Sequence, residues 1–302
     1  MTTTSNWYRF LTTRRGRFAY AVLALGASVS LCAVAQTAQS YGSTDPGGAA
    51  TPELSSLELP SAEETSIMNN RAAVQSGAST RRVIVIGFVG GFARQDDQGH
   101  PEVQFAEYLR NRYRPGLHAE VFGNHYGRKA LHEVLRLLDA DGNGNLSPAE
   151  KENARIIIYG HSWGAAETVV FARELGKQGI PVQLTIQVDS IAKPGRDDSK
   201  IPSNVANAIN LYQSRGPLHG LTEIVAADPA QTTIIGNLQM TYQGHRINCA
   251  NYPWYARTLN RPHHEIENDP RVWDLADSLI DSEVEGRTLT TRISSSWKPF
   301  VK

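Results

Sequence analysis

The chain has 302 residues, of which 40% are hydrophobic, so it is long enough to bury a sizeable core. Its 30 basic and 30 acidic residues balance, and without residues 1–35, which contain four arginines and no acids, 26 basic and 30 acidic residues remain. This balance gives no indication of a nucleic-acid partner or of binding to an anionic membrane surface.

Residues 1–35 have the pattern of a targeting segment. Four arginines precede an apolar run at residues 18–35, and Ala33-Val34-Ala35 provides a cleavage site of the A-x-A type. We therefore expect an exported protein, periplasmic or secreted, from which residues 1–35 are removed as a signal peptide. The alternative is an uncleaved membrane anchor, because about eighteen apolar residues can just span a bilayer.

Residues 36–80 are rich in small and polar residues and show no period of a helix or a strand. This composition predicts a flexible leader, so the folded domain is expected at residues 81–302. If the targeting segment is removed, Cys249 has no partner for a disulfide, and its surroundings favour a buried thiol rather than a metal ligand.

Beyond residue 81, strand-like and helix-like segments alternate, which is typical of a mostly parallel sheet with helices on both faces. The expected strands are residues 82–86, 118–122, 155–159, 182–188, 207–213 and 234–242. The expected helices are residues 101–113, 127–138, 165–177 and 270–282. The fold class is therefore α/β.

Residues 160–164, Gly-His-Ser-Trp-Gly, have the G-x-S-x-G pattern of a nucleophile elbow. An apolar strand precedes them and helix-forming sequence follows, so we expect Ser162 on a sharp strand-to-helix turn. Glycine two residues before and after the serine avoids collisions with the neighbouring strand and helix. The N–H of Trp163 and the dipole of its helix can then stabilise negative charge on a substrate oxygen. The alternative is a tight structural turn.

A glycine-rich stretch follows the first expected strand at residues 87–92. Glycines there allow the backbone to approach the serine, so that a backbone N–H can act as the second oxyanion donor. We expect Phe88 to be this donor, with Val89 as the next candidate. The alternative is an ordinary turn between a strand and a helix.

A serine nucleophile needs a histidine base and an acid that orients the base. Asp189 directly follows an expected strand, which places it at the carboxyl edge of the sheet; the alternatives are a turn role for it, with Asp228 as the acid. His263 and His264 precede the last expected helix. We expect His263 to be the base, because Ile266 can anchor its loop in the core, and the alternatives are His264 or a surface role for both histidines.

The elbow, the glycine-rich stretch, the acid after a strand and the histidine before the last helix together resemble the α/β-hydrolase family of lipases, esterases and thioesterases. The likeness covers residues 81–285. One position departs from the family pattern, since Ile86 stands where the oxyanion loop often has a histidine.

This resemblance implies an α/β-hydrolase fold, a mostly parallel sheet with helices on both faces, and a serine hydrolase activity. Ser162, His263 and Asp189 would form the triad, and Phe88 and Trp163 the oxyanion hole. The implied substrate is a small-molecule or lipid ester, or a thioester, which is cleaved through an acyl-enzyme without a cofactor. Membrane contact is expected only through an uncleaved N-terminal segment.

Residues 139–150 do not belong to that pattern and resemble an EF-hand calcium loop. Glycine stands at loop position 6, and an apolar residue at position 8. The oxygen ligands at positions 1, 3, 5, 7, 9 and 12 would be Asp139, Asp141, Asn143, Asn145, Ser147 and Glu150. A helix enters at residues 129–138, but the exiting helix can hardly pass Asn153, so we expect a structural calcium clip. The alternative is a polar turn.

Two classes of function therefore remain. The first is an exported serine hydrolase, and the second is a calcium-stabilised binding protein on an inactive hydrolase fold. The aromatic residues at positions 252–255 would line an acyl or alcohol pocket in the first case, or simply pack against the core.

Overall fold

The computed structural model describes residues 82–244 and 246–286. The predictions for the targeting segment at residues 1–35 and the leader at residues 36–80 lie outside this part of the chain, as does His245. Within the described ranges, no helix combines the length and the apolar character that crossing a bilayer requires.

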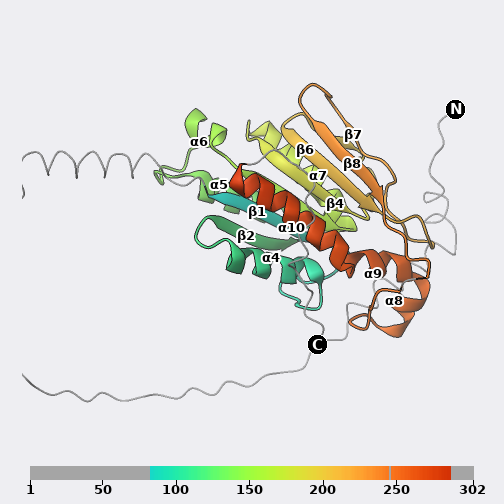
Figure 1. Ribbon diagram of the computed structural model, residues 1–302. Helices are drawn as coiled ribbons and strands as arrows, with labels where there is room; N and C mark the ends of the chain where they lie inside the picture. The colour runs from blue at the N-terminus through green and yellow to red at the C-terminus, as the bar shows by residue number, and fades with distance from the viewer. Residues whose placement is uncertain (1–81, 245, 287–302) are drawn as a thin grey trace, which may run out of the picture. The chain divides into compact units, whose positions relative to one another are not determined.

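A six-stranded parallel sheet forms the centre of the fold, with the strands in the order β2-β1-β3-β4-β6-β8 (Figure 1). The strands are β1 (Val83–Val89), β2 (Leu117–Gly123), β3 (Ile156–His161), β4 (Val182–Val188), β6 (Val205–Tyr212) and β8 (Thr233–Gln239). A separate parallel pair joins β5 (Lys200–Ile201) and β7 (Val225–Ala226).

Helices follow most of the strands. They are α4 (Pro101–Arg112), α5 (Gly127–Leu138), α6 (Pro148–Glu152), α7 (Trp163–Lys177), α8 (Trp254–Leu259), α9 (Arg261–Glu267) and α10 (Pro270–Glu285). Proline begins three of them, where its missing N–H costs no hydrogen bond within the helix. Asp269 caps α10 by accepting from the Arg271 N–H, and Gly286 ends it in a left-handed conformation.

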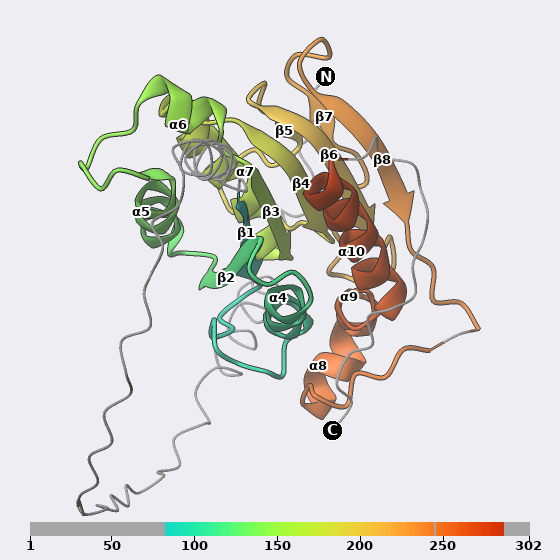
Figure 2. The same ribbon diagram turned by 60° about the vertical axis from the view of Figure 1, so that its left-hand side comes forward.

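The sheet is apolar on both faces because consecutive side chains of a strand point to opposite sides. In β1, Val83 and Val85 pack in the same core cluster as α4 and α10. Ile84 and Ile86 pack in the cluster that contains α5 and α7. Figure 2 shows these two pairs of helices on opposite sides of the sheet.

This architecture confirms the expected α/β-hydrolase fold, and each strand and helix predicted from the sequence is present with small shifts of its ends. The short strands β5 and β7 and the helices α8 and α9 were not expected. The segment that carries His263 was expected to be a loop, but it is the helix α9, which begins after Asn260 with proline in its first turn. This expectation was therefore wrong.

All strands of the central sheet are parallel, so their carboxyl ends meet at one edge. The chain passes from β1 outward to β2 and then returns to β3 on the other side of β1. In open parallel sheets, ligand sites form at such a reversal of strand order. A functional site is therefore expected among the residues that follow β1, β3 and β4.

Candidate active site

Ser162 occupies a strained turn between β3 and α7. Its φ of 57° and ψ of −122° lie in a region that non-glycine residues rarely adopt. A Cβ on Gly160 would lie 2.5 Å from the backbone of Gly164, and a Cβ on Gly164 would collide with the carbonyl oxygen of Phe88. Both glycines of the G-x-S-x-G pattern are thus required by close backbone contacts, as expected.

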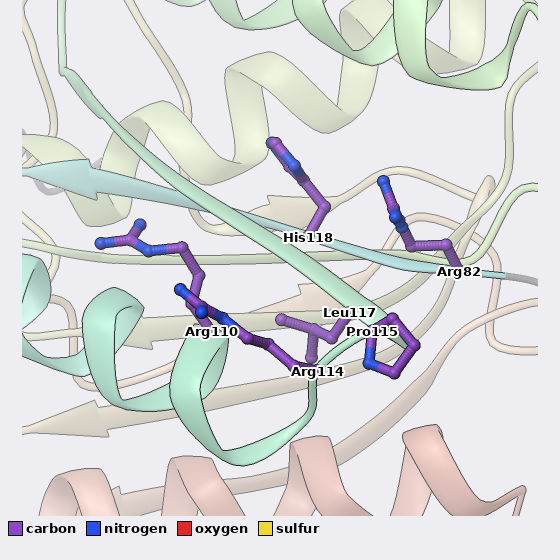
Figure 3. A pocket seen from close by; sticks show the side chains of 6 residues that line it. All are labelled: Arg82, Arg110, Arg114, Pro115, Leu117 and His118. Carbon is purple, nitrogen blue, oxygen red and sulfur yellow. The ribbon is translucent and has the colours of Figure 1, made fainter. Parts of the chain in front are cut away.

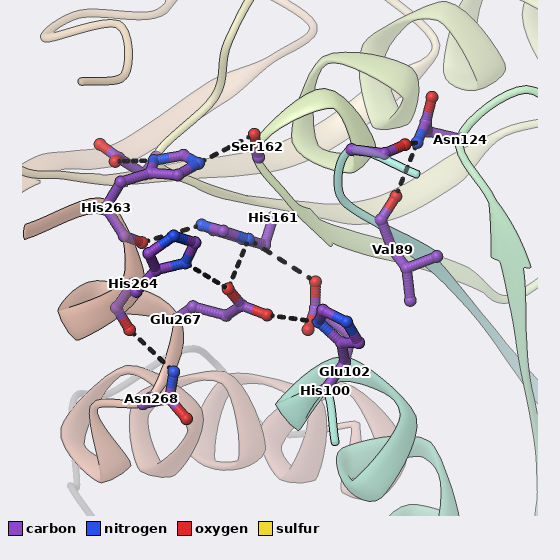
Figure 4. Close-up of polar contacts among 12 residues, drawn as sticks. Val89, His100, Glu102, Asn124, His161, Ser162, His263, His264, Glu267 and Asn268 are labelled. Atoms are coloured by element: carbon purple, nitrogen blue, oxygen red, sulfur yellow. Dashed lines mark hydrogen bonds and ion pairs between the residues drawn. The ribbon is translucent and has the colours of Figure 1, made fainter. Parts of the chain in front are cut away.

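The structure brings Ser162, His263 and Asp189 together. His263 Nε2 lies 3.0 Å from Ser162 Oγ, and His263 Nδ1 lies 2.6 Å from Asp189 Oδ2. Figure 4 shows the His263 ring directed at Ser162. Because a carboxylate can only accept, Nδ1 carries the ring proton and Nε2 is left to accept the serine hydroxyl. All three residues are buried, with Asp189 completely inaccessible.

The carboxylate of Asp189 is held by residues far from it in sequence. Its Oδ1 accepts from the N–H groups of Gln213 at 3.1 Å and Gly220 at 2.8 Å, and its Oδ2 accepts from Gln213 Nε2 at 2.9 Å. Burial alone would raise the pKa of Asp189, but the hydrogen bond and charge of His263, with the Gln213 hydrogen bonds, outweigh it and hold the pKa below its usual value.

Gly220 and the backbone of Asp189 make an unusually close contact. Asp189 has a positive φ of 46°, and a Cβ on Gly220 would lie 2.5 Å from the Asp189 carbonyl carbon. Sequence reasoning missed both Gln213 and Gly220, since no local pattern indicates which distant residue will approach a carboxylate.

The alternative acid and base lie elsewhere. Asp228 is exposed on a turn and accepts from the Ala230 N–H at 2.9 Å. His264 turns its Nδ1 toward Glu267 Oε2 at 3.8 Å and stacks on the ring of Tyr252 at 3.9 Å. The geometry of an acid, base and nucleophile is therefore met by Asp189, His263 and Ser162.

The expectation for the oxyanion loop needs correction. Phe88 lies inside β1, between Phe122 of β2 and Gly160 of β3, with a fully buried side chain. Gly87 lies within the strand and does not begin a turn. Glycine is needed there for packing, because a Cβ would lie 2.5 Å from the ring of Tyr159. The strand continues to Val89, so Phe88 does not occupy the loop position that a second oxyanion donor requires.

The backbone that approaches the nucleophile is at Gly90. A Cβ there would lie 3.0 Å from Ser162 Cβ. Asn124 Nδ2 donates to the carbonyl oxygens of Val89 at 3.1 Å and Gly91 at 2.5 Å, which fixes the turn after β1 (Figure 4). In a trans peptide the C=O and N–H point in opposite directions, so the Gly90 N–H points away from Asn124.

The turn at residues 139–150 brings its three acidic side chains together. Carboxylate oxygens of Asp139, Asp141 and Glu150 lie within 4.8 Å of one another. Asp139 accepts from the N–H groups of Asn143 at 3.1 Å and of the glycine at loop position 6 at 2.9 Å. The helices α5 and α6 flank the loop as expected, and α6 ends at Glu152.

The other expected ligands of this loop lie beside those acids. Asn143 Oδ1 accepts from the Asn145 N–H at 2.7 Å, and the Ser147 hydroxyl donates to Glu150 Oε2 at 2.8 Å. The Asn143 amide donates to Asp141 at 2.7 Å. Hard oxygen donors on a tight loop fit calcium, which prefers six to eight oxygen ligands.

The aromatic residues before α9 have different surroundings. Tyr252 packs between the rings of His100 and His264, whereas Trp254 is 70% exposed. Tyr252 therefore has a packing role, whereas the exposed Trp254 is available at the surface. Cys249 is buried, as expected, and burial raises the pKa of its thiol to about 12.

The structure also has a basic hollow of about 320 Å³, and Figure 3 shows the side chains that line it. It is lined by Arg82, Arg110, Arg114, Pro115, Leu117 and His118. These residues surround the beginnings of β1 and β2, at the amino edge of the sheet. Ser162 lies at the carboxyl edge, so the hollow does not belong to the candidate active site.

No protein-family model matches the chain, and no curated protein does. Among solved structures, it is similar to a cutinase-like protein from Cryptococcus sp., with 15% identity, a TM-score of 0.37, and coverage of 68% of this chain and 97% of that chain. It is also similar to a YdeN-like hydrolase from Pectobacterium atrosepticum, with 16% identity, a TM-score of 0.29, and coverage of 65% and 97%. An uncharacterized protein from Pseudomonas aeruginosa matches at 13% identity and a TM-score of 0.32, covering 58% of this chain and 44% of that one. The assignment of an α/β-hydrolase fold follows from the sheet order and the strained elbow.

Proposed function

We propose that this chain is an exported serine hydrolase that cleaves a carboxylic ester or thioester through an acyl-enzyme. One observation carries the proposal: a serine on a strained elbow lies 3.0 Å from a histidine nitrogen whose other ring nitrogen lies 2.6 Å from a buried carboxylate. This is the arrangement that activates a serine hydroxyl as a nucleophile. Export rests on the pattern of residues 1–35.

The proposed chemistry has two halves. Ser162 Oγ attacks the acyl carbon while His263 Nε2 takes the hydroxyl proton, and Asp189 stabilises the imidazolium that forms. The bond from the acyl carbon to the leaving oxygen or sulfur breaks, and His263 returns the proton to the leaving group. Water then attacks the acyl-enzyme with its proton passing to His263, and Ser162 regains a proton as the carboxylic acid is released.

The negative oxygen of each intermediate needs two N–H donors. We assign one to Trp163, at the first turn of α7, where the helix dipole also favours negative charge. We assign the second to Gly90 in place of Phe88, because Gly90 follows β1 and approaches Ser162. The ring of Trp163 lies edge-on to Phe92 at 5.4 Å, and Phe92 is 49% exposed. An apolar acyl chain would rest on this pair.

We further propose that residues 139–150 bind a structural calcium ion, held by Asp139, Asp141 and Glu150 with the neighbouring amide and hydroxyl oxygens. When bound, calcium would supply only charge neutralisation among the acids. The loop precedes β3 by a few residues, so an ordered loop fixes the entry of the strand that ends at the nucleophile. No chemical step depends on it.

A fluorophosphonate probe tests the function without knowledge of the substrate, because it labels only an activated serine. Wild-type protein should be labelled at Ser162, and Ser162→Ala should not be labelled at all. His263→Ala should label several orders of magnitude more slowly. The exposed His132 on α5 provides a matched control, since His132→Ala should label at the wild-type rate.

The outcome also decides between the two classes of function. An unlabelled wild-type protein that is folded and melts cooperatively would favour a calcium-stabilised binding protein on an inactive hydrolase fold. Normal labelling of His263→Ala together with loss in His264→Ala would move the base by one residue. If wild type is labelled, turnover of p-nitrophenyl esters with increasing acyl length then defines the substrate.

A further inference from the structure

A buried cluster of acids and histidines adjoins the triad. It consists of His100 and Glu102 of α4, His161 of β3 and Glu267 of α9, and we call it the His-Glu cluster. Figure 4 shows these four side chains directed at one another. Glu102 is completely buried, Glu267 is 2% exposed and His161 is 3% exposed. Two buried carboxylates this close are costly unless positive charge compensates them.

The spacing of the donor atoms fits a small cation. Ligand atoms of His100, Glu102 and Glu267 all lie within 4.8 Å of one another. His161 Nδ1 lies 3.3 Å from Glu267 Oε2 and 3.8 Å from Glu102 Oε1, and His100 Nδ1 lies 2.9 Å from Glu267 Oε1. A tetrahedral ion with bonds of about 2.0–2.2 Å places its donor atoms about 3.3–3.6 Å apart. The separations of 3.3 Å and 3.8 Å between His161 Nδ1 and the two carboxylates lie near this spacing.

The two carboxylates of the cluster differ in their hydrogen bonds, since Glu267 pairs with His100 whereas Glu102 has no partner among the described residues. His161 Nε2 lies 3.2 Å from the carbonyl oxygen of His263, which can only accept, so the ring proton of His161 is on Nε2. In the neutral ring with its proton on Nε2, Nδ1 carries a lone pair that faces the two carboxylates. Among the described residues, neither oxygen of Glu102 has a hydrogen-bond partner.

Charge and donor type indicate which ion fits. When both carboxylates are ionised and both imidazoles are neutral, the four side chains carry a charge of −2, which a divalent cation would neutralise. Without the ion, His100 Nδ1 pairs with Glu267 Oε1 at 2.9 Å. Imidazole nitrogen suits zinc and similar transition metals, whereas calcium and magnesium prefer oxygen ligands. The site thus differs in kind from the all-oxygen loop at residues 139–150.

We propose that His100, Glu102, His161 and Glu267 bind one divalent transition-metal ion, with zinc as the best-fitting species. The ion would join α4, β3 and α9, which are remote in sequence. Because His161 donates to the backbone of His263, the ion would also fix the helix that carries His263. It makes no contact with substrate in this proposal, so its role is to position the triad.

Metal binding to the full chain tests this directly. The protein is stripped with a zinc chelator, loaded with Zn²⁺ in the presence of Ca²⁺ and freed of excess metal, and its zinc content is measured by mass spectrometry. Wild type should retain one zinc per chain. Co²⁺ in its place should give the visible absorption of a four-coordinate site with nitrogen ligands, which an all-oxygen loop does not give.

Glu102→Gln is the informative variant, because glutamine keeps the shape of a protonated glutamate but cannot act as a carboxylate ligand. It should weaken zinc affinity by more than about 100-fold. His100→Ala, at a position with a 20% exposed side chain, provides a second variant that should also lose the Co²⁺ absorption. Glu133→Gln is the matched control, since Glu133 lies in another group of acids and histidine but already binds Arg136 at 2.8 Å.

Two results would overturn the proposal. One is a wild-type protein that retains far less than one zinc per chain after loading. The other is zinc binding that survives unweakened in both Glu102→Gln and His100→Ala, whether or not it is lost in Glu133→Gln. A rise in melting temperature of Glu102→Gln with no zinc bound to wild type would instead identify a proton shared between Glu102 and its neighbours.

Discussion

Asp189→Asn is the sharpest perturbation of the candidate triad, because the structure dictates how the asparagine must sit. Oδ1 of Asp189 accepts two backbone N–H groups, from Gln213 and Gly220, so the amide oxygen of asparagine must take that place. The amide NH₂ then replaces Oδ2 and faces His263 Nδ1. Gln213 cannot turn its own amide to help, since its Oε1 accepts from the Arg215 N–H and its Nε2 donates to a backbone carbonyl.

His263 Nδ1 then faces a donor, so it must accept a hydrogen bond instead of donating one. Its Nδ1 loses the proton, Nε2 gains it, and the ring then donates to Ser162 Oγ instead of accepting from it. A histidine in this tautomer cannot act as the base, which costs about four orders of magnitude in rate. This corresponds to about 5.4 kcal/mol of transition-state stabilisation. The loss of one charged hydrogen bond costs about 2 kcal/mol of folding free energy, so the variant should remain folded and melt about 4–8 °C lower.

The assay is the second-order rate of fluorophosphonate labelling at Ser162, measured beside melting curves, with kcat/KM for a p-nitrophenyl ester where turnover is found. Asp228→Asn is the control, since Asp228 is an exposed turn residue. Its labelling rate should stay within about twofold of wild type, because substitutions at exposed positions usually have small effects. Labelling of Asp189→Asn within tenfold of wild type would refute the tautomer argument. An equal loss in Asp228→Asn would refute the choice of acid.

Three further outcomes follow from burial and charge. The folded pKa of Asp189 lies below its unfolded value of about 3.9, so its contribution to stability is present above that pH and is lost as pH falls through the folded value. At low pH, the melting temperature should therefore fall more steeply with decreasing pH for wild type than for Asp189→Asn. If the dissociation constant of calcium is near 0.1 mM, 1 mM calcium should raise the free energy of unfolding by roughly 1.4 kcal/mol and the melting temperature by a few degrees. Replacing Asp139 and Glu150 by alanine should abolish this gain, and wild-type melting curves that coincide with and without calcium would mean that the loop is only a polar turn. The thiol of Cys249, with a pKa raised to about 12, should resist iodoacetamide at pH 8 in the folded protein and react after unfolding. Peptide mapping distinguishes labelled Cys249 from labelled Cys32, and rapid labelling of Cys249 in the folded protein would contradict its burial.

The order of strands and helices could be predicted because a parallel sheet leaves a local signal. Strands buried on both faces are continuous apolar runs, and two of the four predicted helices, α4 and α10, begin with proline. The end of β1 was misjudged at Gly87, since glycine in a sequence indicates a turn and a tight packing contact equally well. Only the position of the Tyr159 ring shows that packing is the reason.

The residues of the candidate site were also predictable only where the sequence carries a local signal. Ser162 was identified by its local motif, and Asp189 by its place directly after a strand, so both depended on neighbours in sequence. The structure places His263 against them, although a helix carries it where a loop was expected. Gln213 and Gly220 had no signal, because their contacts with Asp189 arise only when β4 and β6 lie side by side.

The nucleophile elbow supports the base as well as the nucleophile. His161 directly precedes Ser162, and its buried side chain extends to the backbone of His263 and to Glu267 in α9. The same turn that places Ser162 at the carboxyl edge of the sheet thus contacts the helix that carries His263. A change at the second position of G-x-S-x-G would therefore move the base relative to Asp189 without removing any member of the triad. The buried histidine at the second position of the motif is therefore part of the contacts that hold α9.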